Sequence, residues 1–221
     1  MQILLIFATP IEAGIVQPLL GKEFKSGDRF QIGCHQVDLL ISGVGMVPAS
    51  IITAMTLAVL RPDLVLHAGI SGSYHQSVSI GQTVWVDSEC FPELGKESDE
   101  DFVTFDKMGF DFAGLPFNNN TLRNPFEGYR YLPYRPVMGG ATVSCISNQP
   151  DRGTSVHRRF GALTESMEGG AVLAACMLAK IDCLQLRTIS NYCLPPPDDE
   201  WNLKLALDNL QRAVVDTLKS L

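Results

Sequence analysis

Short apolar runs alternate along the chain with longer stretches of helical period. Strands are expected near Ile3–Ala8, Val37–Ser42, Leu64–His67, Thr83–Val86, Val137–Cys145 and Cys183–Ile189. Helices are expected after Pro10, over Val47–Leu60, over Gly169–Ala179, and from Asp199 to the C-terminus. This order is typical of an α/β fold with a mixed, mostly parallel twisted sheet flanked by helices.

One stretch departs from this rhythm. Residues 90–136 are rich in glycine, proline, asparagine and aromatic residues and show no clear period. So long an irregular connection is usually functional or flexible, and a surface insertion without a role is an equal alternative. The chain is otherwise even in composition and long enough for one sizeable core, so residues 1–221 are expected to form a single domain.

Composition and charge narrow the classes of partner. Hydrophobic residues make up 46% and charged residues 19%, which suits a compact soluble protein. A net charge of -7 without any lysine or arginine cluster argues against nucleic acid. No basic leader precedes the first apolar run, and no apolar segment reaches the length of a membrane span. We therefore expect a cytoplasmic protein that does not bind membranes.

The cysteines and histidines do not indicate a disulfide framework or a metal site. None of the six cysteines forms a C-x-x-C pair, and several fall within apolar strand or helix patterns, which favours free thiols. The four histidines show no ligand spacing with one another or with the cysteines. No metal is expected.

Two glycine-rich segments follow apolar runs. Residues 41–47 place Gly43 and Gly45 where a strand gives way to a helix, and residues 67–73 repeat the pattern. A dinucleotide fingerprint is incomplete, because Pro48 stands in place of its third glycine, and a simple tight turn is the alternative. Two such loops at the carboxyl ends of neighbouring strands would line one crevice, where open α/β sheets bind ligands.

Two polar clusters carry the candidate chemistry. Met167 and Glu168 precede a predicted helix, and a carboxylate there can accept hydrogen bonds from the vicinal hydroxyls of a sugar. Asn191 ends a predicted strand, and its amide can present one donor and one acceptor to the edge of a heterocycle. Alternatively, Glu168 favours the helix N-terminus electrostatically, Met167 fills the core, and Asn191 is a turn residue.

Taken in order, these segments resemble the nucleoside phosphorylase superfamily, in particular the methylthioadenosine/S-adenosylhomocysteine nucleosidases and the futalosine hydrolases. The resemblance spans nearly the whole chain. It rests on Glu12 and on residues 42–45, 68–72, 166–169 and 187–191. Its most specific part is Met-Glu-Gly opening a helix, followed by Arg-x-x-Ser-Asn at the end of the next strand.

The resemblance implies hydrolysis of the N-glycosidic bond of a purine nucleoside, without a cofactor, by a homodimer. Glu12 would activate the attacking water, Asn191 would face N7 and the six-position of the base, and Met167 and Glu168 would bind the ribose. The pocket around the base would be formed by Gly69, Ile70, Val143, Asn148, Ser166 and Ser190. Cleavage builds positive charge on the ribose and negative charge on the purine, which these groups would stabilise.

Two residues sharpen this expectation. Residues 7–12 offer no arginine for a phosphate and add the negative charge of Glu12, so water is favoured over phosphate as the nucleophile. Methylthioadenosine-type nucleosidases carry aspartate where this chain has Asn191. An amide cannot act as an acid, but it can accept from a protonated N7 and donate to a 6-oxo group, which suits hypoxanthine.

The segment after Asn191 extends the resemblance to the futalosine hydrolases, because prolines, acidic residues and Trp201 follow Tyr192. Futalosine is a hypoxanthine riboside with an aromatic carboxylate tail, an intermediate of one menaquinone route. Arg130 or Arg135 could bind that carboxylate, or both could be solvated surface charges. Two other functions stay open: a nucleosidase for methylthioadenosine, S-adenosylhomocysteine or another purine nucleoside, and a non-catalytic module that binds purine nucleosides.

Overall fold

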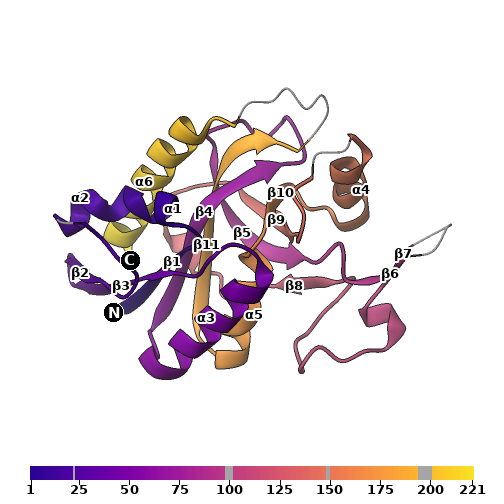
Figure 1. The fold of residues 1–221 in the computed structure, drawn as a ribbon, viewed down its shortest axis with the longest axis horizontal. Coiled ribbons are helices and arrows are strands. Elements are labelled where there is room, and N and C mark those ends of the chain that lie inside the picture. The colour runs from indigo at the N-terminus through magenta and orange to yellow at the C-terminus, as the bar shows by residue number, and fades with distance from the viewer. Residues whose placement is uncertain (22, 98–101, 148–149, 194–200) are drawn as a thin grey trace.

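A nine-stranded mixed sheet forms the centre of the fold (Figure 1). The computed structural model describes residues 1–21, 23–97, 102–147, 150–193 and 201–221. The sheet contains β1 (Gln2–Phe7), β2 (Arg29–Ile32), β3 (His35–Ile41), β4 (Leu64–Ser73), β5 (Thr83–Cys90), β8 (Thr121–Arg123), β9 (Val137–Thr142), β10 (Thr164–Ser166) and β11 (Asp182–Tyr192). A separate antiparallel pair consists of β6 (Gly95–Glu97) and β7 (Phe102–Thr104).

The strand order is β10-β9-β5-β11-β4-β1-β3-β2, with β8 beside β5. The mixed sheet flanked by helices is confirmed, with one difference: β10 pairs with β9 in parallel and also with β4 in antiparallel fashion. The strands β4, β11, β5, β9 and β10 therefore close into a small barrel. Hydrophobic period along the chain carries no information about which strands pair, so this closure was not visible in the sequence.

Helices cover both faces of the sheet. They are α1 (Pro10–Ala13), α2 (Gln17–Leu20), α3 (Met46–Leu60), α4 (Pro150–Phe160), α5 (Gly169–Ala179) and α6 (Leu203–Ser220), with short 3-10 turns at Gly14–Val16, Asp106–Met108 and Gly128–Tyr131. Helices α3 and α5 pack against each other on one face, and α6 lies on the other (Figure 1). None of the helices in the described ranges is long and apolar enough to cross a membrane.

Strand β1 is the first apolar run of the sequence, and its residues do not alternate between apolar and polar. Ile3, Leu5 and Phe7 pack into the core that includes α6, whereas Leu4 and Ile6 point into the core beneath α3 and α5. Side chains alternate between the two faces of a strand, and here both faces are buried. The continuous apolar run therefore indicates a central strand with helices on each side.

The second glycine-rich segment is not a loop, contrary to the sequence-based prediction. Residues 67–73 continue β4, and β11 likewise extends to Tyr192. A Cβ atom on Gly69 would collide with the side chains of Glu12 and Arg187, and one on Gly72 would collide with Cys193. These glycines therefore provide close approach inside a strand and not a turn.

Other boundaries also differ from the predictions. Strands β2 and β10 and helix α4 were not expected, because they are short or, for α4, largely polar. Within the irregular stretch 90–136, the structure contains β6, β7 and β8 and a group of aromatic side chains that includes Phe91, Phe112 and Phe117. The final helix begins at Leu203, and the predicted start at Asp199 lies outside the described residues.

Candidate active site

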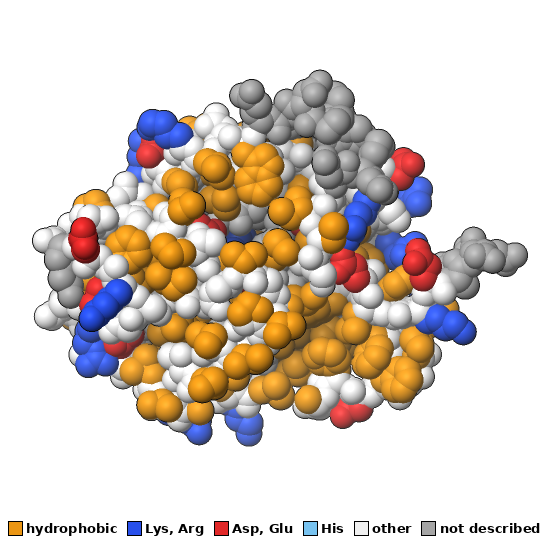
Figure 2. Space-filling view, viewed as in Figure 1, with side chains coloured by type: hydrophobic (Ala, Val, Ile, Leu, Met, Phe, Trp, Pro, Cys, Tyr) orange, Lys and Arg blue, Asp and Glu red, His pale blue; other side chains and the backbone are white. Residues whose placement is uncertain are grey.

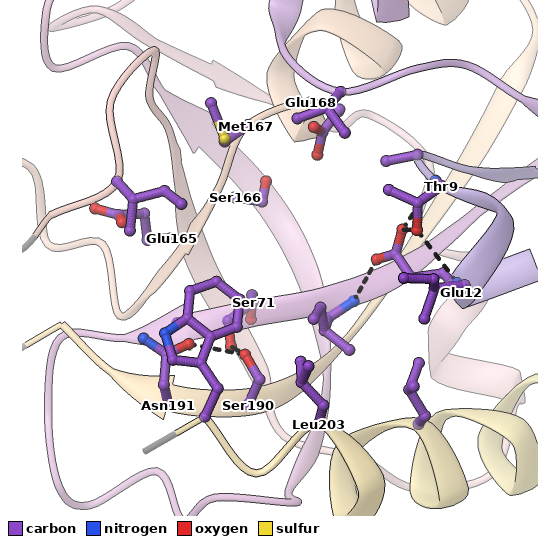
Figure 3. Close-up of a pocket in the computed structure, with 18 of the residues that line it drawn as sticks. Thr9, Glu12, Ser71, Glu165, Ser166, Met167, Glu168, Ser190, Asn191 and Leu203 are labelled. Atoms are coloured by element: carbon purple, nitrogen blue, oxygen red, sulfur yellow. Dashed lines mark hydrogen bonds between the residues drawn. The ribbon is translucent and has the colours of Figure 1, made fainter. Parts of the chain in front are cut away.

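A cavity of about 260 Å³ opens where β4, β11 and the β10–α5 junction meet α1 and α6 (Figure 3). Its polar lining residues are Thr9, Glu12, Ser71, Glu165, Ser166, Glu168, Ser190 and Asn191. Its apolar lining includes Ile11, Val44, Ile70, Ile146, Met167, Trp201, Leu203 and Leu207. In Figure 3, Glu12 and Thr9 lie at one end of the cavity and Asn191 and Ser190 at the other.

Glu12 is a buried carboxylate fixed by its own helix and by β4. Thr9 is the N-cap of α1, Pro10 supplies the first turn, and Glu12 completes a capping box with Thr9. Its Oε2 atom accepts from the Thr9 amide (3.1 Å) and hydroxyl (2.9 Å), while Oε1 accepts from the Ile70 amide (3.0 Å). This network holds the carboxylate in one orientation at the edge of the cavity.

Glu168 stands at the start of α5, but its side chain does not cap that helix. Its Oε1 atom accepts instead from the Gly45 amide (2.8 Å), and Gly45 presents that amide from a backbone conformation with a φ of 92° that favours glycine. Burial raises the pKa of Glu168, Arg187 opposes that shift, and the neighbouring Glu12 adds to it. The first glycine-rich loop therefore orients a carboxylate.

Arg187 is a buried guanidinium beneath these carboxylates. Its Nη2 atom lies 3.1 Å from Nε2 of His67, and burial together with Arg187 lowers the pKa of His67 well below its ordinary value. A Cβ atom on Gly69 would meet both the Arg187 guanidinium and the Glu12 carboxylate. Gly69 therefore leaves room for Arg187 beside Glu12, and it does not line the cavity as the sequence led us to expect.

The other end of the cavity depends on a bulge in β11. Ile189 pairs with Ser71 and Asn191 pairs with Gly72, so Ser190 is the extra residue between them. A bulge interrupts the alternation of side chains, and Ser190 and Asn191 both line the cavity as a result. The Ser190 hydroxyl lies 2.8 Å from Oδ1 of Asn191 and 3.1 Å from the Ser71 carbonyl, and its single proton serves one of them at a time.

The hydrogen bonds of Asn191 within the protein do not fully use the donors and acceptors of its amide. Its nearest contacts through Nδ2 are long, at 3.5 Å to the Tyr192 carbonyl and 4.0 Å to Sγ of Cys193. Oδ1 keeps a second lone pair beside the Ser190 hydroxyl. This buried amide can therefore offer one acceptor and one donor to a ligand in the cavity.

Glu165 is a site residue that the sequence reasoning missed. It is buried in β10, and Oε2 accepts from the Tyr74 hydroxyl (2.5 Å) and from the Ser147 hydroxyl. Oε1 accepts from the Ser147 amide (2.9 Å) and from the Cys193 thiol (3.5 Å). Burial and the Glu165 carboxylate both raise the pKa of Tyr74 and of Cys193. The available signal was a second glutamate three positions before Glu168.

Most of the predicted site residues meet in the cavity. Those that line it are Glu12, Ile70, Ser166, Met167, Glu168, Ser190 and Asn191. Val143 does not, because it is fully buried and its amide donates to the Ser166 carbonyl (2.9 Å). Asn148 lies outside the described residues. The lining residues that were not assigned to the pocket from the sequence are Glu165, Ser71, Thr9 and the apolar side chains of the rim.

The two arginines considered for a carboxylate tail are placed elsewhere, so that hypothesis is wrong for the structure described. Arg130 pairs with Glu127 (3.0 Å). Arg135 lies over the Trp85 ring (5.6 Å) and 3.8 Å from Asp216. Neither lines the cavity. Nothing in residues 128–136 indicated that Arg135 packs against the distant β5 and α6.

A second buried carboxylate, Glu89, supports α5 from below. It accepts from the Thr142 hydroxyl (2.9 Å) and from the Gln185 amide, and Thr142 in turn accepts from the Gly170 amide (2.6 Å) in the first turn of α5. Burial raises the pKa of Glu89 from 4.5 to about 7, against the opposing effects of Gln185 and Arg187. Glu89 thus lies beneath the helix whose start carries Glu168.

Within the described ranges, no three or more His, Cys, Asp and Glu side chains are grouped so that they could hold a metal ion. All six cysteines are free thiols. The polar side chains of the cavity are carboxylates, hydroxyls, the Asn191 amide and the Cys193 thiol.

Comparison with known proteins identifies the family. The family model of the phosphorylase superfamily matches residues 3–221, and this chain belongs to that superfamily. It is 30% identical over 181 residues to a futalosine hydrolase from Thermus thermophilus, covering 79% of this chain and 78% of that relative. It is 29% identical over 163 residues to the 5'-methylthioadenosine/S-adenosylhomocysteine nucleosidase of Bacillus subtilis, covering 71% and 68% of the two chains.

The fold agrees with this membership. The structure of the 5'-methylthioadenosine/S-adenosylhomocysteine nucleosidase from S. pneumoniae, with a transition-state inhibitor, superimposes with a TM-score of 0.78 at 20% identity. The match covers 100% of this chain and 99% of that one. The resemblance stated from the sequence is therefore confirmed at the level of family and fold.

The raised pKa of Glu89 predicts a pH dependence of stability. The unfolded chain holds this carboxyl at its ordinary pKa, so the native state binds more protons between pH 4.5 and about 7. The contribution of Glu89 to the free energy of unfolding is thus greatest below pH 4.5 and is lost as the pH rises to 7. The free energy of unfolding, measured with urea, should therefore decline between pH 5 and pH 8 in the wild type. We expect it to decline less over this range in Glu89→Gln.

The exposed Glu127→Gln variant is the matched control, and it should keep the wild-type slope of stability against pH. Identical slopes in the wild type and in Glu89→Gln would contradict the assignment. Some slope should persist in Glu89→Gln, because burial also raises the pKa of Glu168.

Proposed function

We propose that the whole chain, residues 1–221, acts as one catalytic domain that hydrolyses the N-glycosidic bond of futalosine and releases hypoxanthine. The observation that carries this proposal is the division of one cavity into two ends, with the Glu12 carboxylate at one and the Asn191 amide at the other (Figure 3). The futalosine hydrolases among the relatives support the substrate. Hydrolysis of futalosine belongs to one route of menaquinone biosynthesis.

The ribose lies between the two ends, against Met167 and Glu168. Glu168 already accepts from the Gly45 amide through Oε1, which leaves Oε2 to accept from the 2'- and 3'-hydroxyls of the sugar. The transition state carries positive charge on the ribose ring, and the buried carboxylates of Glu168 and Glu12 stabilise it more than the neutral ground state.

Water is the nucleophile in this proposal. Glu12 retains a lone pair on Oε1 beside the Ile70 amide, so it can orient a water molecule and take its proton. The water oxygen bonds to C1' and its proton passes to Glu12 as the bond from C1' to N9 breaks. N7 of the departing purine takes its proton from solvent, because the Asn191 amide cannot act as an acid. A phosphate would need a cation, and the described residues that line the cavity include no arginine or lysine.

The departing base is a 6-oxopurine. Asn191 accepts from N7–H through Oδ1 and donates to O6 through Nδ2, the two functions that its protein contacts leave available. A 6-amino group would place two donors against the amide NH2. This match favours hypoxanthine over the adenine that a methylthioadenosine nucleosidase would release.

The open side of the cavity suits an aromatic 5'-substituent. The exposed apolar side chains of Val44, Trp201 and Leu203 border the cavity on this side. Val44 and Trp201 come from loops that are far apart in the chain. An apolar rim also accepts an alkylthio group, so it does not distinguish futalosine from methylthioadenosine. Discrimination between these substrates therefore rests on the base.

We also propose a homodimer that acts in the cytoplasm. Val47, Ile51, Met55 and Val59 recur every four residues on α3 and are between 52% and 88% exposed. Figure 2 shows apolar side chains gathered over the region of α3 and α5. A contiguous exposed apolar face of this kind is typical of an interface. The six free thiols suit a reducing compartment.

The role of Glu12 predicts a separation of chemistry from binding. Glu12→Gln keeps the side-chain shape but cannot take a proton, so turnover of futalosine should fall by at least about 100-fold, the usual contribution of a general base. Binding of the substrate should stay within an order of magnitude. Turnover is measured as the release of hypoxanthine by chromatography, and binding of the substrate is measured by calorimetry. Glu127→Gln should match the wild type, and unchanged turnover in Glu12→Gln would remove Glu12 from the mechanism.

The role of Asn191 predicts the substrate preference. With futalosine, aminofutalosine, methylthioadenosine and inosine, the wild type should release hypoxanthine from futalosine fastest. Asn191→Asp should shift kcat/KM towards the 6-amino substrates, because a carboxyl can accept from the amino group and donate to N7. Asn191→Ala should cost 6-oxo substrates about 1–3 kcal/mol for each lost hydrogen bond. Adenine released fastest by the wild type would overturn the futalosine assignment.

The apolar face of α3 predicts the oligomeric state. Wild-type protein should sediment as a dimer at micromolar concentration, and Met55→Lys should shift it towards monomer by burying a charge in the interface. Met108→Lys, a matched change at a methionine outside this face, should leave the dimer intact. A monomeric wild type, or a dimer unaffected by Met55→Lys, would contradict the proposal.

A further inference from the structure

Glu165 is a buried carboxylate of the cavity that has no role in the proposed hydrolysis. It lines the cavity and is 5% exposed. Among the described residues its carboxylate enters no ion pair, and the hydrogen bonds it forms come from the Tyr74 and Ser147 hydroxyls, the Ser147 amide and the Cys193 thiol. A carboxylate buried without a cation is costly unless donors satisfy it. The site is therefore built to keep an acceptor at this position.

The position is next to Asn191. Cys193 joins the two, with its Sγ 3.5 Å from Oε1 of Glu165 and 4.0 Å from Nδ2 of Asn191. In Figure 3, Glu165 and Asn191 lie on the same side of the cavity, away from Glu12. Glu165 therefore belongs to the end of the cavity assigned to the base.

The edge of a 6-oxopurine runs from N7 through O6 to N1. An amide that spans N7 and O6 leaves N1 as the next polar atom along that edge. In hypoxanthine N1 carries a hydrogen and donates, whereas in adenine N1 is a lone pair that accepts. A carboxylate that meets this atom attracts the first base and repels the second.

We propose that Glu165 accepts the N1–H of the departing 6-oxopurine and is a specificity-determining residue of the site. This inference rests on the proposed function and extends it from Asn191 to the neighbouring strand β10. The two residues then read three consecutive atoms of the base, and only a 6-oxopurine satisfies both.

Of the four hydrogen bonds that Glu165 accepts, the weakest is the one that N1–H of the base would replace. A thiol is a poor donor, and the Cys193 contact is the longest of those that Glu165 makes. N1–H can take its place on Oε1 while Tyr74 and Ser147 keep holding the carboxylate. Those stronger donors orient Glu165 before the substrate arrives, so the contact requires little reorganisation.

The test is the ratio of kcat/KM for futalosine to that for aminofutalosine, measured within each variant. Because the ratio is taken within one preparation, a change in the folded fraction cancels. Glu165→Gln can present either an acceptor or a donor to N1, so the ratio should fall by about tenfold or more, as for loss of a hydrogen bond to a charged group. Glu127→Gln makes the same chemical change at an exposed carboxylate that does not line the cavity, and it should keep the wild-type ratio.

A ratio in Glu165→Gln that stays at the wild-type value would overturn the assignment. An equal loss of kcat/KM for both substrates is such a result, and it is expected if Glu165 only holds Ser147 and Tyr74 in place. If the wild type releases no hypoxanthine from any nucleoside, the proposed function fails first, and the binding of free bases then tests Glu165 by itself.

That binding measurement also serves if Glu165→Gln does not fold. The wild type is titrated with hypoxanthine, 1-methylhypoxanthine and 2-methylhypoxanthine. The first methyl group removes the N1 hydrogen, while the second adds the same bulk at the neighbouring atom and keeps that hydrogen. We expect the 1-methyl base to bind at least about tenfold more weakly than the 2-methyl base. Equal affinities for the two methylated bases would overturn the proposal.

Discussion

The buried guanidinium of Arg187 is the charge on which the candidate site depends. Three carboxylates, those of Glu12, Glu89 and Glu168, are buried around it, and its charge opposes the effect of burial on the pKa of Glu89 and of Glu168. Isolated carboxylates would be expensive in such an interior, and a central cation makes their ionised forms less costly. Gly69 makes this arrangement possible, because a side chain there would occupy the space of Arg187 and Glu12.

The closure of the sheet explains how residues from distant segments meet. Strand β10 pairs with both β9 and β4, which brings residues 164–168 beside Ile70, Ser71 and Gly72. The bulge in β11 then turns Ser190 and Asn191 towards the same space. The two ends of the cavity differ in chemistry as a result. In the proposed mechanism, Glu12 and Glu168 lie where the ribose becomes positive, and Asn191 and Glu165 lie where the base departs.

The proposed specificity follows from donors and acceptors more than from shape. In this proposal, the apolar rim around Leu203 accommodates several 5'-substituents, and the ribose contacts of Glu168 suit any nucleoside. In the same proposal, it is the end of the cavity at Asn191 and Glu165 that presents a pattern of donors and acceptors suited to one class of purine. A mismatched base would leave buried polar groups unpaired, and that penalty discriminates more strongly than an apolar contact.

Local pattern in the sequence determined the elements that carry most of the site. Neighbouring residues indicate the apolar run of β1, the Met-Glu-Gly start of α5 and the apolar strand β11 that leads to Asn191. Seven of the site residues that the family resemblance implied line the cavity: Glu12, Ile70, Ser166, Met167, Glu168, Ser190 and Asn191.

Only the tertiary structure decided the rest. Glycine at position 69 resembles a loop residue in sequence, but in the fold it provides space inside a strand for Arg187, which is distant along the chain. Glu165 lies in a segment where no strand was predicted, and it comes to lie beside Cys193 and Asn191 because β10 closes the barrel. Sequence period reports which face of an element is buried, whereas strand pairing, bulges and close packing depend on contacts between residues far apart in the chain.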